Sequence, residues 1–214
     1  MTTLPYPELF AMLGRRLAAQ DAMPPQAIDK AEAGLQLTVP NALRDFYLQA
    51  GNARDFIAVY DQFLAPSEWG VQDGRLIFVE ENQDVVRYGV DCSADAPADP
   101  PVWIATTGAT LEWHPASDTC SGFIAAMLAW QAAFGEALPF TGSGLATPAA
   151  TAALAGGDWR HLGTVNGMSA YLRPGQAVCQ VEWDEGVRLF VSALTDESFW
   201  ALEDLLGVEL EAHD

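Results

Sequence analysis

The stretch Leu76–Val90, LIFVEENQDVVRYGV, contains two apolar runs that are separated by a short polar segment. Alternate residues of a β-strand share one face, and Val86, Tyr88 and Val90 follow that spacing. The pattern predicts a β-hairpin with strands over residues 76–79 and 85–90. Two adjacent carboxylates lie where the first strand ends, and their purpose is the first question that the sequence raises.

The adjacent carboxylates do not form a convincing catalytic pair. If the strand continues to Glu81, Glu80 and Glu81 point to opposite faces of the sheet. They cannot then act on one substrate as the facing acid and base of a glycosidase. Two readings stay open: a polar turn in which Asn82 and Gln83 satisfy backbone groups, or a surface that contacts a partner.

The chain around the hairpin reads as a mixture of helices and short strands. Apolar spacing, prolines in first turns and glycines at ends predict helices over 7–20, 25–34, 40–50, 119–134 and 196–206, and a short helix over 147–156. Apolar or alternating runs predict strands over 56–64, 102–106, 110–113, 161–164, 169–172, 177–183 and 187–193. Because few strands are joined through a helix, we expect an α+β fold with a largely antiparallel sheet flanked by helices.

Composition shifts along the chain suggest how it is organised. Residues 137–157 are mostly Ala, Thr, Gly and Pro with no charged side chain, which is typical of a connector. The expected organisation is an α+β core over 1–136, this connector, and a β-meander with a C-terminal helix over 158–214. We expect the last segment to extend the same domain.

The bulk composition predicts a cytoplasmic protein. Half of the 214 residues are hydrophobic, which is ample for a core, yet no apolar run approaches the roughly 18–20 residues that span a membrane. The first residues lack the basic and apolar regions of a secretory signal. Cys92, Cys120 and Cys179 are scattered and odd in number, as expected in a reducing compartment.

The charge is strongly acidic. The chain has 29 Asp and Glu against 10 Lys and Arg, and its formal net charge is −19. Such a surface repels phosphate backbones and anionic membranes, so binding to nucleic acid or to a membrane is not expected. It attracts basic proteins, although acidity can also serve solubility alone.

No motif points to catalysis, a cofactor or a metal. The three histidines are far apart in the sequence, and prolines interrupt the series Asp91, Asp95 and Asp99. Ser143 lies in TGSGL, which lacks the full GxSxG pattern, and Cys120 has no histidine or basic residue close in sequence. No glycine-rich nucleotide motif is present. The expectation is a protein with no catalytic residue and no cofactor.

Four segments resemble one known family when they are taken in order. They are AEAGLQLTVPNALRDFYLQAGN at 31–52, FLAPSEW at 63–69, the hairpin with its Glu–Asn–Gln, and DPPVW at 99–103. A proline-opened helix followed by glycine, a strand ending in Glu–Asn–Gln, and a later Asp–Pro–Pro–Val–aromatic stretch are common in the SUKH superfamily, the Smi1/Knr4-like proteins. The chain is similar to that superfamily over roughly residues 27–134.

The resemblance implies an α+β domain without catalytic activity. Bacterial members are chiefly immunity proteins that neutralise toxins, many of them nucleases, and fungal relatives act as scaffolds. We therefore expect a non-catalytic immunity protein, with a scaffold or regulatory module as the alternative. A hydrolase that uses Glu80, Glu81 or Asp84 is a third reading from a different class.

The expected partner is a basic protein, namely a toxin domain. Carboxylates can take the places of phosphates in a basic cleft, and buried aromatic side chains can anchor a partner. The predicted contact residues are the acids of the hairpin tip and the following loop, with two tryptophans as anchors: Glu80, Glu81, Asp84, Asp91, Asp95, Asp99, Trp69 and Trp103.

Overall fold

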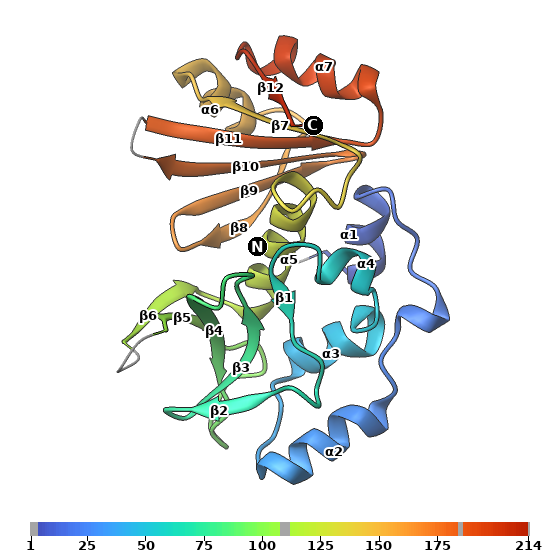
Figure 1. Ribbon diagram of the computed structural model, residues 1–214, viewed down its shortest axis with the longest axis vertical. Coiled ribbons are helices and arrows are strands. Elements are labelled where there is room, and N and C mark those ends of the chain that lie inside the picture. Colours follow the sequence, from blue (N-terminus) through green and yellow to red (C-terminus); the bar gives the residue numbers. More distant parts are fainter. Residues whose placement is uncertain (1–3, 108–111, 184–185, 214) are drawn as a thin grey trace. The chain divides into compact units, whose positions relative to one another are not determined.

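The fold is α+β, as predicted, with antiparallel sheets and flanking helices. The computed structural model describes residues 4–107, 112–183 and 186–213 (Figure 1). The chain divides into two compact units, one of residues Leu17–Ile124 and one of Met1–Arg16 with Ala125–Asp214. We call them the hairpin unit and the meander unit. Their boundaries differ from the predicted segments, because the division falls inside a helix.

The hairpin unit begins with helices and continues with a sheet. Its elements are a 3₁₀ turn at Ala19–Asp21, α2 (Pro25–Leu35), α3 (Asn41–Ala50), α4 (Arg54–Ile57), β1 (Gln62–Phe63), β2 (Gly70–Gln72), β3 (Arg75–Glu80), β4 (Val86–Asp91), β5 (Val102–Thr106), β6 (Trp113–Ser117) and the start of α5 (Cys120–Ala133). The strand order is β1-β3-β4-β5-β6, and β2 also pairs with β3. All of these pairings are antiparallel.

Aromatic side chains form the core of the hairpin unit. The Phe46 ring lies 5.2 Å from that of Phe63, and the Phe78 ring lies 5.4 Å from that of Phe123. These rings come from α3, β1, β3 and α5, so the core joins the helices to the sheet. The Phe78–Phe123 pair is edge-to-face, a geometry that adds roughly 0.5–1.5 kcal/mol beyond the buried area, and the Phe46–Phe63 pair is tilted.

The central hairpin is confirmed. β3 and β4 pair from Arg75 opposite Asp91 to Glu80 opposite Arg87, with an irregularity between Ile77 and Val79. β3 is one residue longer at each end than predicted, and β4 has the predicted length but begins and ends one residue later, at 86 and 91 instead of 85 and 90.

The meander unit contains one antiparallel sheet and its helices. Its elements are α1 (Tyr6–Met12), the rest of α5, β7 (Phe140–Leu145), α6 (Pro148–Ala155), β8 (Arg160–Val165), β9 (Met168–Arg173), β10 (Gln176–Trp183), β11 (Gly186–Ala193), α7 (Asp196–Leu206) and β12 (Glu211–Ala212). The strand order is β12-β7-β11-β10-β9-β8. The predicted meander and the closing helix are confirmed.

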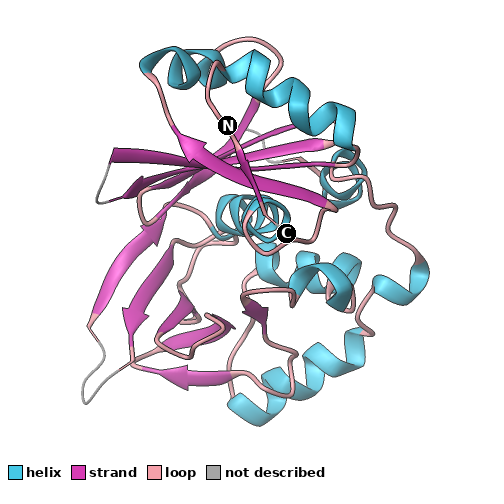
Figure 2. Cartoon of the chain, turned by 45° about the horizontal axis from the view of Figure 1, so that its top comes forward, coloured by secondary structure: helices cyan, strands magenta, loops and turns pink. Residues whose placement is uncertain are grey.

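The two faces of this sheet carry different helices. Leu189 and Val191 belong to a buried cluster with residues of α6 and α7, which lie together on one face (Figure 2). Phe190 points the other way, since successive side chains alternate, and it packs edge-on against Trp130 and Phe134 of the α5 segment. Both faces are therefore covered by apolar side chains.

Two predicted elements are wrong. The first helix ends at Met12 rather than at residue 20, because Gly14 has a φ of +78° that leaves the helix. The predicted strand 56–64 is instead the single turn α4 followed by the short strand β1. A short apolar run does not by itself distinguish these alternatives. Part of the predicted strand 110–113 lies outside the described residues, and β6 covers Trp113–Ser117.

The predicted connector also differs from the structure. Residues 137–157 include β7, which lies between β11 and β12. The short helix predicted over 147–156 is confirmed as α6, which packs in the buried cluster. The glycines of β7 misled the sequence reading. They are needed because β12 and α7 approach closely: a Cβ on Gly142 would lie 2.6 Å from the Glu211 carbonyl oxygen and 2.7 Å from Phe199.

None of the helices in the described ranges is long and apolar enough to cross a membrane.

The close approach of β12 and Phe199 to Gly142 gives a testable prediction. Gly142→Ala should destabilise the meander unit by about 2 kcal/mol, because the new methyl must displace the β12 backbone and Phe199. Gly156→Ala is the matched control in the same unit, since its nearest new contact is 3.6 Å away. Urea unfolding followed by circular dichroism measures both. Equal midpoints for the two variants would contradict the packing described for β7.

Candidate functional site

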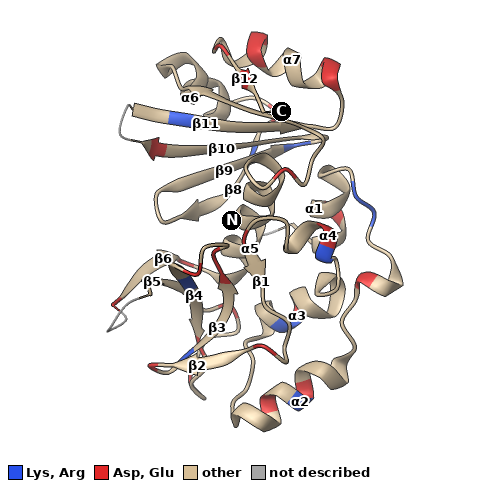
Figure 3. Ribbon diagram, in the orientation of Figure 1, with Lys and Arg blue, Asp and Glu red and all other residues tan. Residues whose placement is uncertain are grey.

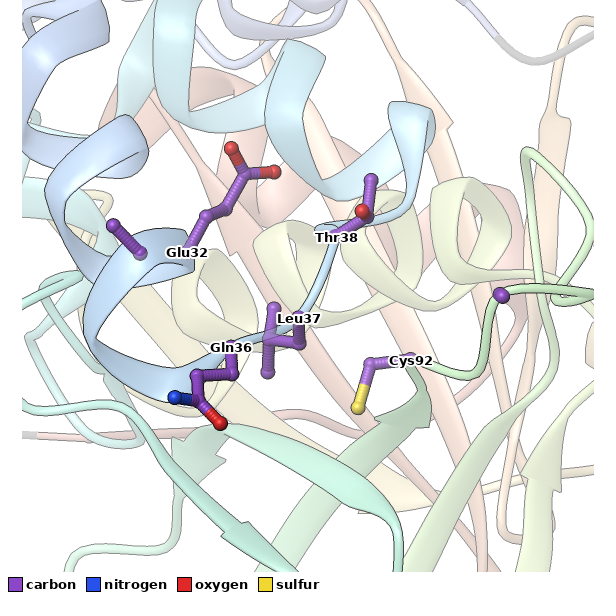
Figure 4. A pocket seen from close by; sticks show the side chains of 7 residues that line it. Glu32, Gln36, Leu37, Thr38 and Cys92 are labelled. Atoms are coloured by element: carbon purple, nitrogen blue, oxygen red, sulfur yellow. The ribbon is translucent and has the colours of Figure 1, made fainter.

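A groove in the hairpin unit is the candidate functional site. Two adjoining hollows of about 400 and 450 Å³ share Gln36, Leu37 and Cys92 as lining residues. One wall is the end of α2 and the loop after it, and the other includes β2 and the end of β4. Figure 4 shows Leu37 and Thr38, from the loop after α2, on one side of the first hollow and Cys92 on the other.

The α2 wall is held by a network of hydrogen bonds. Gln36 adopts the left-handed conformation, with a φ of 57°, and ends the helix in place of the predicted Gly34. One oxygen of the Glu32 carboxylate accepts a hydrogen bond from the Val39 N–H at 2.8 Å, and the other pairs with Arg44 at 2.9 Å. Arg44 also pairs with Asp29. The loop that carries Leu37 is therefore held at Gln36, where α2 ends, and at Val39, and Arg44 links it to α3.

The opposite wall is built from two tight chain reversals. Asp73 and Gly74 join β2 to β3 with φ angles of 52° and 77°, a conformation that suits a two-residue hairpin. At the end of β4 the Asp91 carboxylate accepts a hydrogen bond from the Ser93 N–H at 2.8 Å. Cys92 donates a weak bond to the Gly74 carbonyl at 3.5 Å. Burial, and then the neighbouring Asp91, raises the pKa of the Cys92 thiol.

A stack of indole and guanidinium groups borders the second hollow. The Arg75 guanidinium lies 4.4 Å from the Trp103 ring centroid and 5.2 Å from that of Trp113. The Trp113 indole N–H also donates to Asp73 at 3.2 Å. Gly89 makes room for this stack, since a Cβ there would lie 3.2 Å from both Arg75 and Trp113. Trp103 thus lines the groove, but its ring already contacts the Arg75 guanidinium.

The acids at the hairpin tip have partners within the chain. Arg87 pairs with Glu80 at 3.2 Å and with Asp84 at 3.0 Å. The Glu81 carboxylate accepts a hydrogen bond from the Gln83 N–H at 3.0 Å. The backbone of the turn is therefore satisfied by Glu81, a role that the sequence reading had given to Asn82 and Gln83.

The six predicted acids do not lie together. Asp91 is opposite Arg75 at one end of the hairpin, and Glu80 is opposite Arg87 at the other. Five residues of strand, at roughly 3.3 Å each, separate these ends. Asp91 therefore belongs to the groove end, whereas Glu80, Glu81 and Asp84 belong to the tip.

The remaining predicted residues have distinct positions. Asp99 accepts hydrogen bonds from both the backbone N–H and the hydroxyl of Ser121, at 2.8 and 2.5 Å, in the first turn of α5. Asp95 is exposed in the loop after β4. Trp69 is only 6% exposed, and it packs edge-on against Tyr47 while its N–H donates to Leu64. Trp69 is thus a core residue in this fold.

Sequence reasoning missed the apolar residues of the groove. Leu37 is half-buried at the end of α2, and Val71 is 45% exposed on β2. The Asp73–Gly74 turn was the one available signal for the β2–β3 hairpin. No local pattern brings Leu37 and Val71 to one groove, because they are far apart in the sequence.

One serine–histidine approach also escaped the sequence reading. Ser143, on β7, lies 3.4 Å from His213, but it is only 3% exposed and accepts a hydrogen bond from Arg188 at 3.1 Å. This burial favours a structural role that ties β12 to β7. Within the described ranges, no three His, Cys, Asp or Glu side chains are grouped to hold a metal ion.

Comparison of the chain with family models, curated proteins and solved structures finds no match. The resemblance to the SUKH superfamily therefore rests on the sequence motifs alone.

The contacts of Asp99 predict that it stabilises the fold. Asp99→Ala should lower the free energy of unfolding of the hairpin unit by about 1–2 kcal/mol, because the first turn of α5 loses a capping carboxylate. Asp95→Ala is the control on the same loop and should leave stability unchanged. Urea denaturation measures both. If Asp99→Ala is as stable as the unmodified protein, the capping role is wrong and Asp99 stays a predicted partner contact.

The raised pKa of Cys92 predicts slow alkylation. A higher pKa means less thiolate at a given pH, so iodoacetamide at pH 8 should react more slowly with Cys92 than with a cysteine in an unstructured peptide. The rate should still be rising at a pH where the peptide has reached its plateau. Cys92→Ser should abolish labelling, since Cys120 and Cys179 are buried. Rapid labelling at pH 7 would contradict the described environment.

Proposed function

We propose that the chain is a non-catalytic binding protein that contacts a basic protein partner through the groove of the hairpin unit. The partner that fits best is a toxin domain, so that the chain acts as an immunity protein. The observation that carries the proposal is the groove itself, whose lining includes the carboxylates of Glu32, Asp73 and Asp91. The family resemblance supplies the biological setting.

Electrostatics favours a basic partner. Acidic residues outnumber basic ones throughout both units (Figure 3), and the net charge is −19. A field of this sign steers cationic surfaces toward the protein and raises the association rate by about tenfold or more at low salt. The groove adds local direction, because Asp91 and Asp73 are held in place by hydrogen bonds to Ser93 and Trp113.

Apolar contact would supply residence time. Leu37 and Val71 offer partly exposed aliphatic surface beside the acids, and exclusion of water from such surface contributes about 25 cal/mol per Å². Rigid walls reduce the entropy lost on binding. The braced loop after α2 meets that requirement.

The alternatives are less well supported by the geometry. A scaffold or regulatory module would use the same groove for a different partner, and the identity of the neighbouring gene separates these two readings. For a hydrolase, Glu80 and Asp84 would have to leave Arg87, and Glu81 would have to leave the turn. No observation favours that chemistry.

Co-expression with the product of the neighbouring gene tests the proposal. Association rates should be measured at low ionic strength, where the Debye length is about 30 Å, and near 1 M salt, where it is about 3 Å. The double variant Asp91→Asn and Asp95→Asn should slow association by about threefold to tenfold at low salt only. Asparagine at position 91 keeps the oxygen that accepts from Ser93.

The matched control removes the same charge from the hairpin tip. The double variant Glu81→Gln and Asp84→Asn should associate at nearly the unmodified rate, because these side chains serve the turn and Arg87. If the neighbouring product does not bind at all, the immunity role is wrong. If the tip variant slows association as much as the groove variant does, the groove is not the contact surface.

A further inference from the structure

The groove is bordered by an open strand edge. Among the described strands, β2 pairs with β3 alone, and its register is regular from Gly70 opposite Ile77 to Gln72 opposite Arg75. Val71, at the centre of β2, lines the second hollow. The open edge is therefore next to the candidate site.

The turn geometry determines which backbone groups are free on that edge. Because Asp73 and Gly74 form a two-residue hairpin, Gln72 and Arg75 are the pair that exchange hydrogen bonds. Hydrogen-bonded and non-bonded pairs alternate in an antiparallel ladder, so the next pair, Val71 and Leu76, is not bonded. The N–H and C=O of Val71 then point away from β3. They present one donor and one acceptor in the spacing that an added strand requires.

We propose that the groove takes an extended basic segment of the partner protein, which adds as a strand to β2 and pairs with the backbone of Val71. This inference rests on the proposed binding role and names how the partner is held. Strand addition derives affinity from main-chain hydrogen bonds and specificity from alternate side chains. One face of the segment carries apolar side chains toward Leu37, and a lysine or arginine side chain meets Asp73 at the end of β2.

Charge decides between possible occupants. An acidic segment would meet the groove carboxylates of Asp73 and Asp91, while the Arg75 guanidinium already lies over the rings of Trp103 and Trp113. A second copy of this chain would bring another net charge of −19. Lysine and arginine are the side chains that complement the carboxylates of the groove.

A defined peptide tests the inference without any natural partner. The probe is an acetylated and amidated hexapeptide in which Lys and Val alternate, added to the full chain at low salt. Cys92 lines both hollows, so an occupied groove should protect its thiol from iodoacetamide in a saturable way. Nuclear magnetic resonance should show the Val71 amide among the shifted signals. Two control peptides, one with Glu in place of Lys and one N-methylated on alternate amides, should not protect Cys92.

Two variants at one position isolate the backbone contribution. Val71→Pro removes the outward N–H, which the pairing of β2 with β3 does not use, and proline is tolerated on such an edge. Val71→Thr keeps the N–H and the branched shape. The affinity for the peptide should fall by at least about tenfold in Val71→Pro, which loses a main-chain hydrogen bond. It should fall by less than about threefold in Val71→Thr, which keeps that bond. Unchanged urea midpoints confirm that both variants are folded.

Each outcome has a definite meaning. Equal peptide affinity of Val71→Pro and Val71→Thr, or protection by the N-methylated peptide, would overturn strand addition. Failure of the basic peptide to protect Cys92 would also overturn it. None of these results alters the association assay with the neighbouring gene product, so failure of the binding role is read separately.

Discussion

The pairing of β3 with β4 sets the positions of the groups in the hairpin unit. Its register places Arg75 and Asp91 at the groove end, and Glu80 and Arg87 at the tip. At the irregularity of this ladder, Phe78 enters the aromatic core, where it contacts Phe63 of β1 and Phe123 of α5. A register shift of one residue would turn each of these side chains to the other face of the sheet. The groove, the tip and the core therefore depend on one ladder.

The acids show how little net charge says about contacts. Glu80 and Asp84 neutralise Arg87, Glu81 closes a turn, and Asp99 caps a helix. Each of these roles is local and would be needed in a protein with no partner. What such acids still offer a partner is their summed field, which acts over distances of about 10 Å at ordinary salt. Steering therefore comes from the whole surface with local direction from the groove acids, whereas residence time comes from contacts inside the groove.

Local patterns predicted the elements that local forces determine. The hairpin strands, α5 and α7 follow from periodicity and caps that lie within a few residues, such as Thr195 and Gly207 around α7. The strand β7 could not be predicted, because its glycines are required by the close approach of the Glu211 backbone, which lies far along the chain. Likewise the role of Asp99 depends on Ser121, and the groove depends on Leu37 meeting the β2 hairpin. Long-range contacts determine all three, and no window of sequence contains them.

The edges of the two sheets are treated differently, and the difference bears on function. In the meander unit, β7 is covered by the short acidic strand β12, and β8 carries an irregularity next to Gly163, both devices that discourage pairing with other chains. The pairing of β2 with β3 has no such irregularity. Its edge is instead short and flanked by carboxylates, which would repel other acidic chains while accepting a basic one. An edge of this kind limits aggregation through charge rather than through closure, and so it leaves its backbone groups open to a selected partner.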